Sequence, residues 1–553
     1  MMLTSKTHTS LFGAAAPGRD GPAAFIDAPS AEVWTAQLPF DDPLRCNQLL
    51  LGELSRIHLL RLHSADRLEM LEVLRGVIMG VQEACGQLCL NCLAPLTAPQ
   101  KALVGQVLAL WQVTSAAYEH CLKTWSNKER DELTRPKALH RALDALARSI
   151  AEYYSAYRSP AESLFTSLHA LYGIGERLGL LEVPIKDPQR VQATTCARDA
   201  YVYALLLDSC LPRQYSDKEF AVTRLMLERW AGRVRIVMPG APAGEDSAPP
   251  FVVDLQAPRG LSTRHDRPVD LRVLDMSGLA TALRRALSAL HHGAEPGAAG
   301  LAPGLNRREY EVLLLSLYQQ WCDGGIKRQH DRQASDSHAH VSNGLVAAHF
   351  YLSRQPFHQP NDPVNIPQRG VSTASEHKAD RIRVATEYLQ VHRIHAEQWR
   401  IQDESITGLG MMRPAVEAGD SWLCLGLLLS VRPRGLNNTL LGTIQWLEEA
   451  RQGDIFVGVR LLPGIPAPIA ARRMGVESFE PAVLLLPLPA VNAPSSILLV
   501  TGRFEAQTVI EIWREGIDRI HLTGLLESSG GFDRFAFMPA GSVYDPANAA
   551  TEI

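Results

Sequence analysis

The sequence predicts an α+β protein of several domains: an all-α helical domain, then a small antiparallel β-barrel, then a further β-rich region. Three observations predict this. Apolar residues recur at helical spacing between residues 44 and 238. After residue 326, short runs of β-branched and aromatic residues alternate with turn residues. The chain of 553 residues is also long enough for several domains of roughly 100–200 residues each.

The composition is that of a globular protein without a strong charge bias. Apolar residues make up 46% of the chain, charged residues make up 21%, and the formal net charge is −4. Polymeric nucleic acids and anionic membranes attract strongly basic surfaces, so neither is an expected partner. The longest apolar runs are much shorter than the roughly 20 residues that a membrane-spanning helix needs, so we expect no membrane insertion.

The N-terminal residues and the cysteines both predict a cytoplasmic protein. Residues 1–8 contain one lysine and are not followed by the apolar stretch of a secretory signal. The nine cysteines are an odd number at irregular spacing. Such cysteines are typical of reduced thiols rather than of a secreted disulfide framework.

The first part of the chain is expected to be a short arm followed by packed helices. Residues 1–40 are rich in Ala, Gly, Pro and Ser and are predicted to be poorly ordered. Residues 44–238 are predicted to form the helical domain. Its clearest apolar stripe recurs at steps of three and four residues: Leu139, Leu143, Leu146 and Ile150. Pro and Gly breaks between such stripes indicate helices that pack antiparallel to one another.

A mixed α/β segment is expected next. Residues 239–248 are rich in Pro, Gly and Ala and are predicted to be a linker. The segment itself is predicted at residues 249–323. It has strand patterns at 251–255 and 271–274, followed by a helical pattern at 276–291.

Residues 326–465 have the pattern of the barrel. The strand candidates are residues 338–352, 398–412, 423–431, 439–446 and 455–462. A stretch rich in Pro, Gln and Asn is predicted to be an insertion at 354–380 between two of these strands. A last β-rich region is predicted at 480–540.

Two short polar motifs lie in the barrel region. The segment Arg328-Gln329-His330-Asp331-Arg332 reads RxxxR, and Asp403-Glu404-Ser405-Ile406-Thr407-Gly408 reads DxSxxG. Either motif alone is common, because exposed arginines are frequent and an aspartate often caps a turn. Asp275-Met276-Ser277-Gly278-Leu279-Ala280 is a near match without the final glycine, at the start of a predicted helix. The order of the two motifs and the strands after each make the combined pattern informative.

In this order the two motifs resemble those of the PilZ family, which binds the bacterial second messenger cyclic di-GMP. The residues that match are Arg328, Arg332, Asp403, Ser405 and Gly408. The segments Gly442–Trp446 and Gly458–Leu461 also resemble later strands of the family. The resemblance covers about residues 326–465 and implies a six-stranded barrel that binds the dinucleotide. The motifs lie closer together in the family, so the insertion would account for the extra length.

The residue types suit such a ligand. The fork of an arginine can donate two hydrogen bonds to guanine O6 and N7 or to a phosphate, and its flat face can stack on a purine. The carboxylate of Asp403 can accept from the N1–H and amino edge of guanine, and Ser405 offers a hydroxyl group. Gly408 is expected to permit a positive φ and a close approach of backbone to ligand.

The sequence therefore predicts a cyclic di-GMP receptor and effector rather than an enzyme. Its ligand is cyclic di-GMP, and no metal or other cofactor is expected. Binding would be passed to an unidentified protein partner through the helical domain.

Two alternatives stay open. One is a degenerate PilZ-like scaffold that binds proteins without nucleotide. The other is an iron–sulfur enzyme, because Cys85, Cys89 and Cys92 have the CxxxCxxC spacing of radical-SAM enzymes. These cysteines lie in an amphipathic helical stretch without parallel βα repeats around it, which favours buried structural thiols. The histidines near the RxxxR motif match no familiar metal-site spacing.

Overall fold

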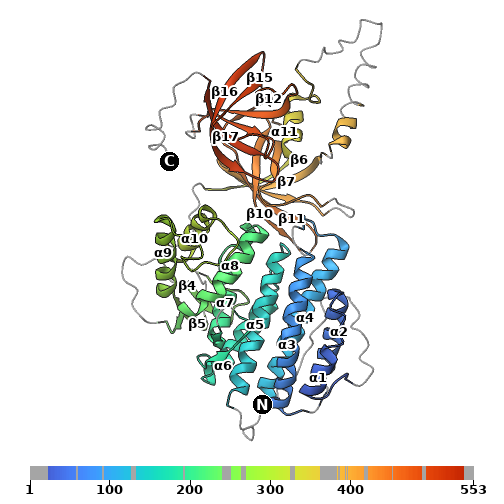
Figure 1. Ribbon diagram of the computed structural model, residues 1–553, viewed down its shortest axis with the longest axis vertical. Helices are drawn as coiled ribbons and strands as arrows, with labels where there is room; N and C mark the ends of the chain where they lie inside the picture. Colours follow the sequence, from blue (N-terminus) through green and yellow to red (C-terminus); the bar gives the residue numbers. More distant parts are fainter. Residues whose placement is uncertain are drawn as a thin grey trace. The chain divides into compact units, whose positions relative to one another are not determined.

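The computed structural model describes residues 23–57, 60, 62–89, 92–125, 132–190, 193–239, 251–262, 269–323, 331–360, 383, 386–392, 394, 396–415, 421–436, 438–450, 452–488 and 493–540. The chain divides into two compact units, Met1–Lys327 and Arg328–Ile553 (Figure 1). The first unit is mainly helical, and the second contains two closed antiparallel barrels. The predicted α+β multidomain class is therefore confirmed.

The first unit is built around long helices that lie side by side (Figure 1). Its first eight helices are α1 (Ala28–Thr35), α2 (Pro43–Ile57), α3 (Ser64–Gln87), α4 (Ala98–Thr124), α5 (Thr134–Ser155), α6 (Glu162–Arg177), α7 (Ala197–Ser209) and α8 (Asp217–Trp230). Helix α5 is buried along almost its whole length, and its predicted apolar stripe is in the core. Helix α1 falls inside the predicted arm, which is therefore too long, because Asp27 and Ser30 form a capping box that starts this helix.

The rest of the first unit is the mixed segment. A two-stranded hairpin pairs β1 (Ile185–Lys186) with β2 (Thr194–Thr195). A three-stranded sheet has the order β3-β5-β4, formed by β3 (Arg235–Val237), β4 (Phe251–Asp254) and β5 (Leu271–Asp275). Helices α9 (Ser277–His291) and α10 (Arg307–Cys322) follow. In the near-match motif, Asp275 accepts a hydrogen bond from the Ser277 amide at 3.0 Å, so that motif is a turn that leads into α9.

The first barrel has the closed strand order β10-β11-β8-β7-β6-β9. Its strands are β6 (Gln333–Asn343), β7 (Ala396–Ser405), β8 (Gly408–Arg413), β9 (Leu428–Pro433), β10 (Leu440–Glu449) and β11 (Ile455–Leu461). The strand predicted at 338–352 is wrong in its second half, where helix α11 (Gly344–Ser353) follows a positive φ at Gly344. Most of the predicted insertion at 354–380, namely residues 361–380, lies outside the described residues.

The second barrel has the closed order β12-β13-β14-β17-β16-β15. Its strands are β12 (Ile465–Arg473), β13 (Glu480–Leu486), β14 (Ser496–Leu499), β15 (Thr508–Trp513), β16 (Ile517–Ser528) and β17 (Asp533–Pro539). The barrel begins at Ile465, before the predicted start at 480. Strand β12 escapes prediction because proline and alanine, which are poor strand formers, fill positions 466–468 and 470–471.

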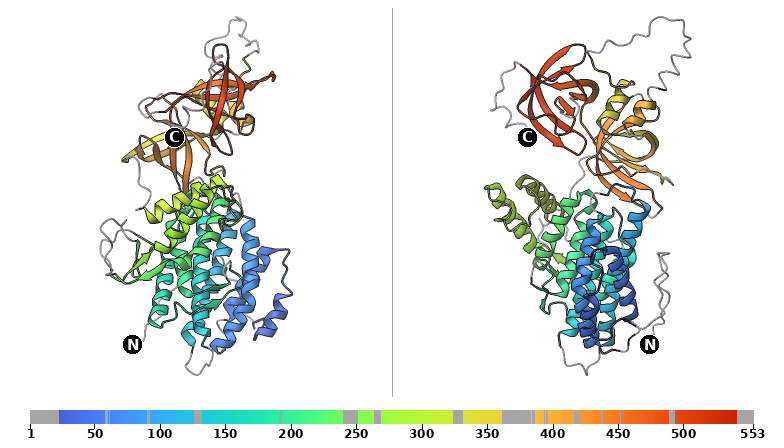
Figure 2. Two further views of the ribbon diagram at one scale, coloured as in Figure 1. Left: turned by 60° about the vertical axis from the view of Figure 1, so that its left-hand side comes forward. Right: turned by 45° about the vertical axis from the view of Figure 1, so that its right-hand side comes forward.

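Figure 2 shows the backbone of the two barrels of the second unit. An apolar cluster joins these barrels. Its buried members are Leu345, Ala348, Leu428, Leu441, Leu462, Val483, Leu485, Leu498 and Phe532. Helix α11 contributes to this cluster from the first half of the unit, so its apolar face is used for packing between barrels. Among the described residues, none of the helices has the length and apolar character to span a bilayer.

Candidate functional site

The two sequence motifs meet on the first barrel. Strand β6 pairs with β7 so that Ala334 lies opposite Asp403. Arg332, just before β6, donates a hydrogen bond from Nη1 to Asp403 Oδ1 at 2.5 Å. Residues separated by 71 positions are thus in direct contact. Arg328, the other arginine of RxxxR, lies outside the described residues.

The DxSxxG motif forms the tight hairpin between β7 and β8. Ser405 and Gly408 are register partners, and the Ser405 hydroxyl donates to the Gly408 carbonyl oxygen at 3.2 Å. The amide of Leu461 donates to the Thr407 carbonyl oxygen at 2.9 Å, which ties this turn to the end of β11. Three strands therefore fix the position of the motif.

Gly408 is required for a different reason from the positive φ that the sequence predicted. It is not among the residues with positive φ. A Cβ atom there would instead lie 2.9 Å from the Val459 carbonyl oxygen, which is too close for any side chain. The same position is 3.9 Å from Arg332 Nη2, which places the arginine beside this glycine at ordinary van der Waals distance. The predicted close approach of this backbone to a ligand stays a prediction.

Two more glycines lie next to Gly408 on the same face of the barrel. Gly410 and Gly458 are register partners on β8 and β11. A Cβ on Gly410 would lie 2.5 Å from Asp403 Oδ1, and one on Gly458 would lie 1.9 Å from Trp446 Nε1. The Asp403 carboxylate and the Trp446 indole therefore lie directly over glycines. We call the three residues Gly408, Gly410 and Gly458 the glycine floor.

The glycine floor belongs to the outer face of the barrel. Side chains alternate along each strand, and the neighbours Leu409 and Val459 are buried in the interior. The sequence analysis missed Gly410 as a site residue and used Gly458 and Trp446 only as strand markers. Glycines at alternate positions of one strand were the available signal, because a glycine within a strand often marks a close approach.

The charges above the floor are accessible to solvent. The Arg332 side chain is 25% exposed and the Asp403 side chain is 38% exposed. Arg460 is the register partner of Gly408 on β11, and its Nη2 lies 2.6 Å from Glu527 Oε1 of the second barrel. Ion pairs in such settings contribute about 0–1 kcal/mol and rearrange easily. An anion with hydrogen-bonding groups could therefore compete for these arginines.

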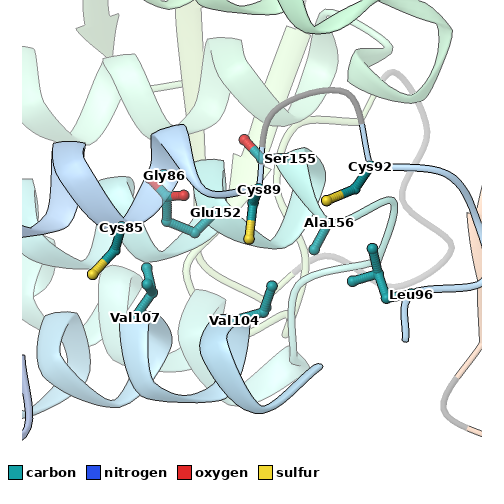
Figure 3. A pocket seen from close by; sticks show the side chains of 10 residues that line it. All are labelled: Cys85, Gly86, Cys89, Cys92, Leu96, Val104, Val107, Glu152, Ser155 and Ala156. Carbon is teal, nitrogen blue, oxygen red and sulfur yellow. The ribbon is translucent and has the colours of Figure 1, made fainter. Parts of the chain in front are cut away.

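The three cysteines of the iron–sulfur alternative lie at the end of α3. Figure 3 shows them lining a mainly apolar pocket with residues such as Val104 and Val107. Burial raises the pKa of Cys85 to about 11 and that of Cys89 to about 12, and it also raises the pKa of Cys92. Such burial in apolar surroundings is typical of structural thiols. Within the described ranges, no cluster of three or more His, Cys, Asp or Glu side chains is placed to hold a metal ion.

The histidines near the motifs also differ from a metal site. His338 and His340 lie on β6 at alternate positions. His349 is buried on α11, and burial lowers its pKa to about 4. His330 lies outside the described residues.

Two family models match the chain on either side of the first barrel. The model described as "Cyclic-di-GMP receptor FimW, N-terminal domain" matches residues 29–242, which run from α1 to just past β3. The model described as "FimW C-terminal beta-barrel domain" matches residues 469–540 of the second barrel. Together the two matches take in slightly more than half of the chain. No curated protein gives a significant match.

Proposed function

We propose that this chain binds cyclic di-GMP on the outer face of its first barrel. It belongs to the FimW family of PilZ-type cyclic-di-GMP receptors. The residues proposed to bind are Arg328, Arg332, Asp403, Ser405 and Gly408. The observation that carries the proposal is the contact between Arg332 and Asp403, which brings the two motifs to one face of the barrel.

The chemistry of that face suits a guanine dinucleotide. The Asp403 carboxylate and the Trp446 indole lie over the glycine floor, so a guanine that binds at this face would meet a carboxylate for its polar edge and an aromatic ring for its flat face. Asp403 can accept from the N1–H and amino edge of a guanine. Arg332 can donate two parallel hydrogen bonds to guanine O6 and N7 or to a phosphate. Their mutual contact in the free protein holds both groups near the floor until the ligand takes over these hydrogen bonds.

We infer that the output is binding rather than catalysis. The RxxxR segment starts at Arg328, which is also the first residue of the second compact unit. A dianion that bridges this segment to β7 and β8 would fix the connection between the helical unit and the barrels. Ligand concentration would then change how the helical unit meets a protein partner in the cytoplasm.

Calorimetric titration of the full chain tests the proposal. Cyclic di-GMP should release heat on binding, whereas cyclic di-AMP should not bind, because adenine lacks the O6 acceptor and the N1–H donor. Asp403→Ala should weaken binding about 10- to 100-fold, since a hydrogen bond to a charged group contributes about 1.5–3 kcal/mol.

The matched control is Asp336→Ala. Asp336 lies on β6 and pairs with Arg400 of β7 at 2.8 Å, which is also a surface Arg–Asp pair on these two strands. This variant should bind like the wild type. Absence of both heat and thermal shift with cyclic di-GMP would contradict the proposal and favour the protein-binding scaffold.

A further inference from the structure

Arg460 is a cation beside the glycine floor that neither motif contains. It lies opposite Gly408 in the pairing of β11 with β8 and opposite Thr443 in the pairing of β11 with β10. Its neighbour Val459 points into the barrel, so the Arg460 side chain leaves from the outer face that carries the floor. Directly opposite residues of an antiparallel pair are only about 4.5–5.5 Å apart at Cα. Arg332 and Arg460 therefore flank Gly408 from two sides.

The Arg460 side chain contacts the second barrel. Its Nη2 donates to Glu527 Oε1 at 2.6 Å and is 3.5 Å from the Thr443 hydroxyl oxygen. Glu527 lies on β16 and is the register partner of Arg534 on β17, next to an irregularity in that pairing. The pKa of Arg534 is lowered by burial and by Arg460, and it is raised by the nearby Glu527 carboxylate. The Glu527 carboxylate thus lies near two arginines and would keep one of them if the other left.

The Arg460–Glu527 contact is suited to exchange. The Arg460 side chain is 42% exposed, and an ion pair with that much exposure is weak. A phosphodiester group offers the same guanidinium two acceptor oxygens and one negative charge, so it can replace the carboxylate as a bidentate partner. The apolar cluster between the barrels does not depend on this ion pair, so its opening leaves the packing of the unit in place.

We propose that Arg460 is a further ligand-binding residue, which binds a phosphate of the dinucleotide and is held away from it by Glu527 in the free protein. This inference rests on the proposed function. Because Glu527 and the phosphate compete for one guanidinium, the second barrel lowers the affinity of the site for the ligand. Ligand binding in turn breaks a contact of the second barrel. Linkage makes the effect reciprocal: removal of Glu527 tightens ligand binding, and ligand binding releases Glu527.

A double-mutant cycle on the full chain tests the competition by calorimetric titration with cyclic di-GMP. Glu527→Gln should tighten binding about two- to fivefold, the range that corresponds to an exposed ion pair. Arg460→Met should weaken binding about 10- to 100-fold, because it removes a charged hydrogen bond to phosphate. In the Arg460→Met background, Glu527→Gln should have no effect on affinity.

The matched control is Glu511→Gln, which breaks the pairs of Glu511 with Arg472 and Arg519 elsewhere on the second barrel. It should leave the affinity unchanged. If the wild type binds but neither Glu527→Gln nor Arg460→Met changes the affinity, the competition is refuted and the proposed receptor function stands. If Glu527→Gln weakens binding, the carboxylate assists the ligand and the competition is also refuted. If the wild type does not bind, both proposals fail together.

Discussion

Both compact units contain arginine–aspartate contacts, but the two sets differ in how many of their donor and acceptor atoms already form hydrogen bonds. In the helical unit, Asp187 accepts from Arg75 at 2.7 and 2.9 Å and from Arg141 at 2.6 Å, and its side chain is fully buried. On the first barrel, Arg332 and Asp403 are joined by one hydrogen bond and stay accessible to solvent. In the first arrangement both carboxylate oxygens already accept hydrogen bonds, so this saturated contact stabilises the fold of the helical unit. The second keeps donors and acceptors that a ligand can use.

The surroundings of the buried aspartate support this difference. Burial alone would raise the pKa of Asp187, but Arg75 and Arg141 lower it below its usual value. Asp144 lies in the same cluster, where Arg148, Arg190 and Arg75 keep its pKa low against burial. A ligand could enter such a cluster only by leaving several buried charges without partners, which is unfavourable. Arginine–aspartate contacts therefore indicate a binding site only where they are open.

The largest expected effect is on the stability of the helical unit. Asp187→Ala leaves Arg75 and Arg141 buried without this partner and should lower the free energy of unfolding by about 3–5 kcal/mol. Urea unfolding followed by circular dichroism at 222 nm measures the loss. Glu182→Ala removes the exposed partner of Arg198 and should lower stability by less than about 1 kcal/mol. Equal losses in the two variants would remove the distinction between saturated and open pairs.

The next effect concerns the open pair. Gly410→Ala places a Cβ atom 2.5 Å from Asp403 Oδ1, so the carboxylate must move off the glycine floor. Cyclic di-GMP affinity should fall about 10- to 100-fold, because a charged hydrogen bond loses its geometry. Gly524→Ala on β16, where a Cβ would meet no atom within 4 Å, is the control and should bind normally. Wild-type affinity in Gly410→Ala would show that Asp403 is not placed for the ligand by this contact.

Acid should lower the free energy of unfolding, because His140 is buried in its neutral form. Burial, reinforced by Arg190, lowers the pKa of His140 from 6.5 to about 3. Between these values the unfolded chain binds a proton that the folded chain does not, so stability falls as the pH falls. The loss is about 1.4 kcal/mol per pH unit, or about 2 kcal/mol from pH 6.5 to 5.

The pH effect is measured by urea unfolding of wild type and His140→Gln at both pH values. The variant should lose less stability on acidification than the wild type by about that 2 kcal/mol. Identical pH dependence would mean that His140 is not kept neutral by its surroundings.

The smallest expected effect is at Ser405. Its hydroxyl donates to the Gly408 carbonyl oxygen at 3.2 Å, and Ser405→Ala removes one neutral hydrogen bond from the hairpin. Cyclic di-GMP affinity should fall about two- to fivefold, in line with about 0.5–1 kcal/mol for such a bond. A loss as large as that of Asp403→Ala would mean that the hydroxyl contacts the ligand more strongly than the floor geometry suggests.

Local patterns were enough to predict the elements whose signals are local. The apolar stripe of α5 follows from helical periodicity. The single strand predicted at 398–412 is wrong, because the tight turn between Ser405 and Gly408 divides it into β7 and β8. The apolar run of α11 reads equally well as a strand, because a short run has no distinct period. Strand β12 was hidden by its prolines and alanines.

The remaining site features depend on long-range geometry. Gly410 and Gly458 become neighbours only through the register of β8 with β11, which no local pattern fixes. The contact of Arg460 with Glu527 depends on how the two barrels pack. Arg332 and Asp403 could be assigned to one site in advance only because the family resemblance supplied the order of the motifs.

The central claim is that the open Arg332–Asp403 pair, and not surface arginine in general, recognises the ligand. The direct test is a calorimetric comparison of Arg332→Ala with Arg400→Ala, whose arginine pairs with Asp336 on the neighbouring surface of the same strands. Arg332→Ala should weaken cyclic di-GMP binding about 10- to 100-fold while its unfolding free energy changes by less than about 1 kcal/mol, and Arg400→Ala should bind like the wild type. Equal affinities for the two variants would contradict the account.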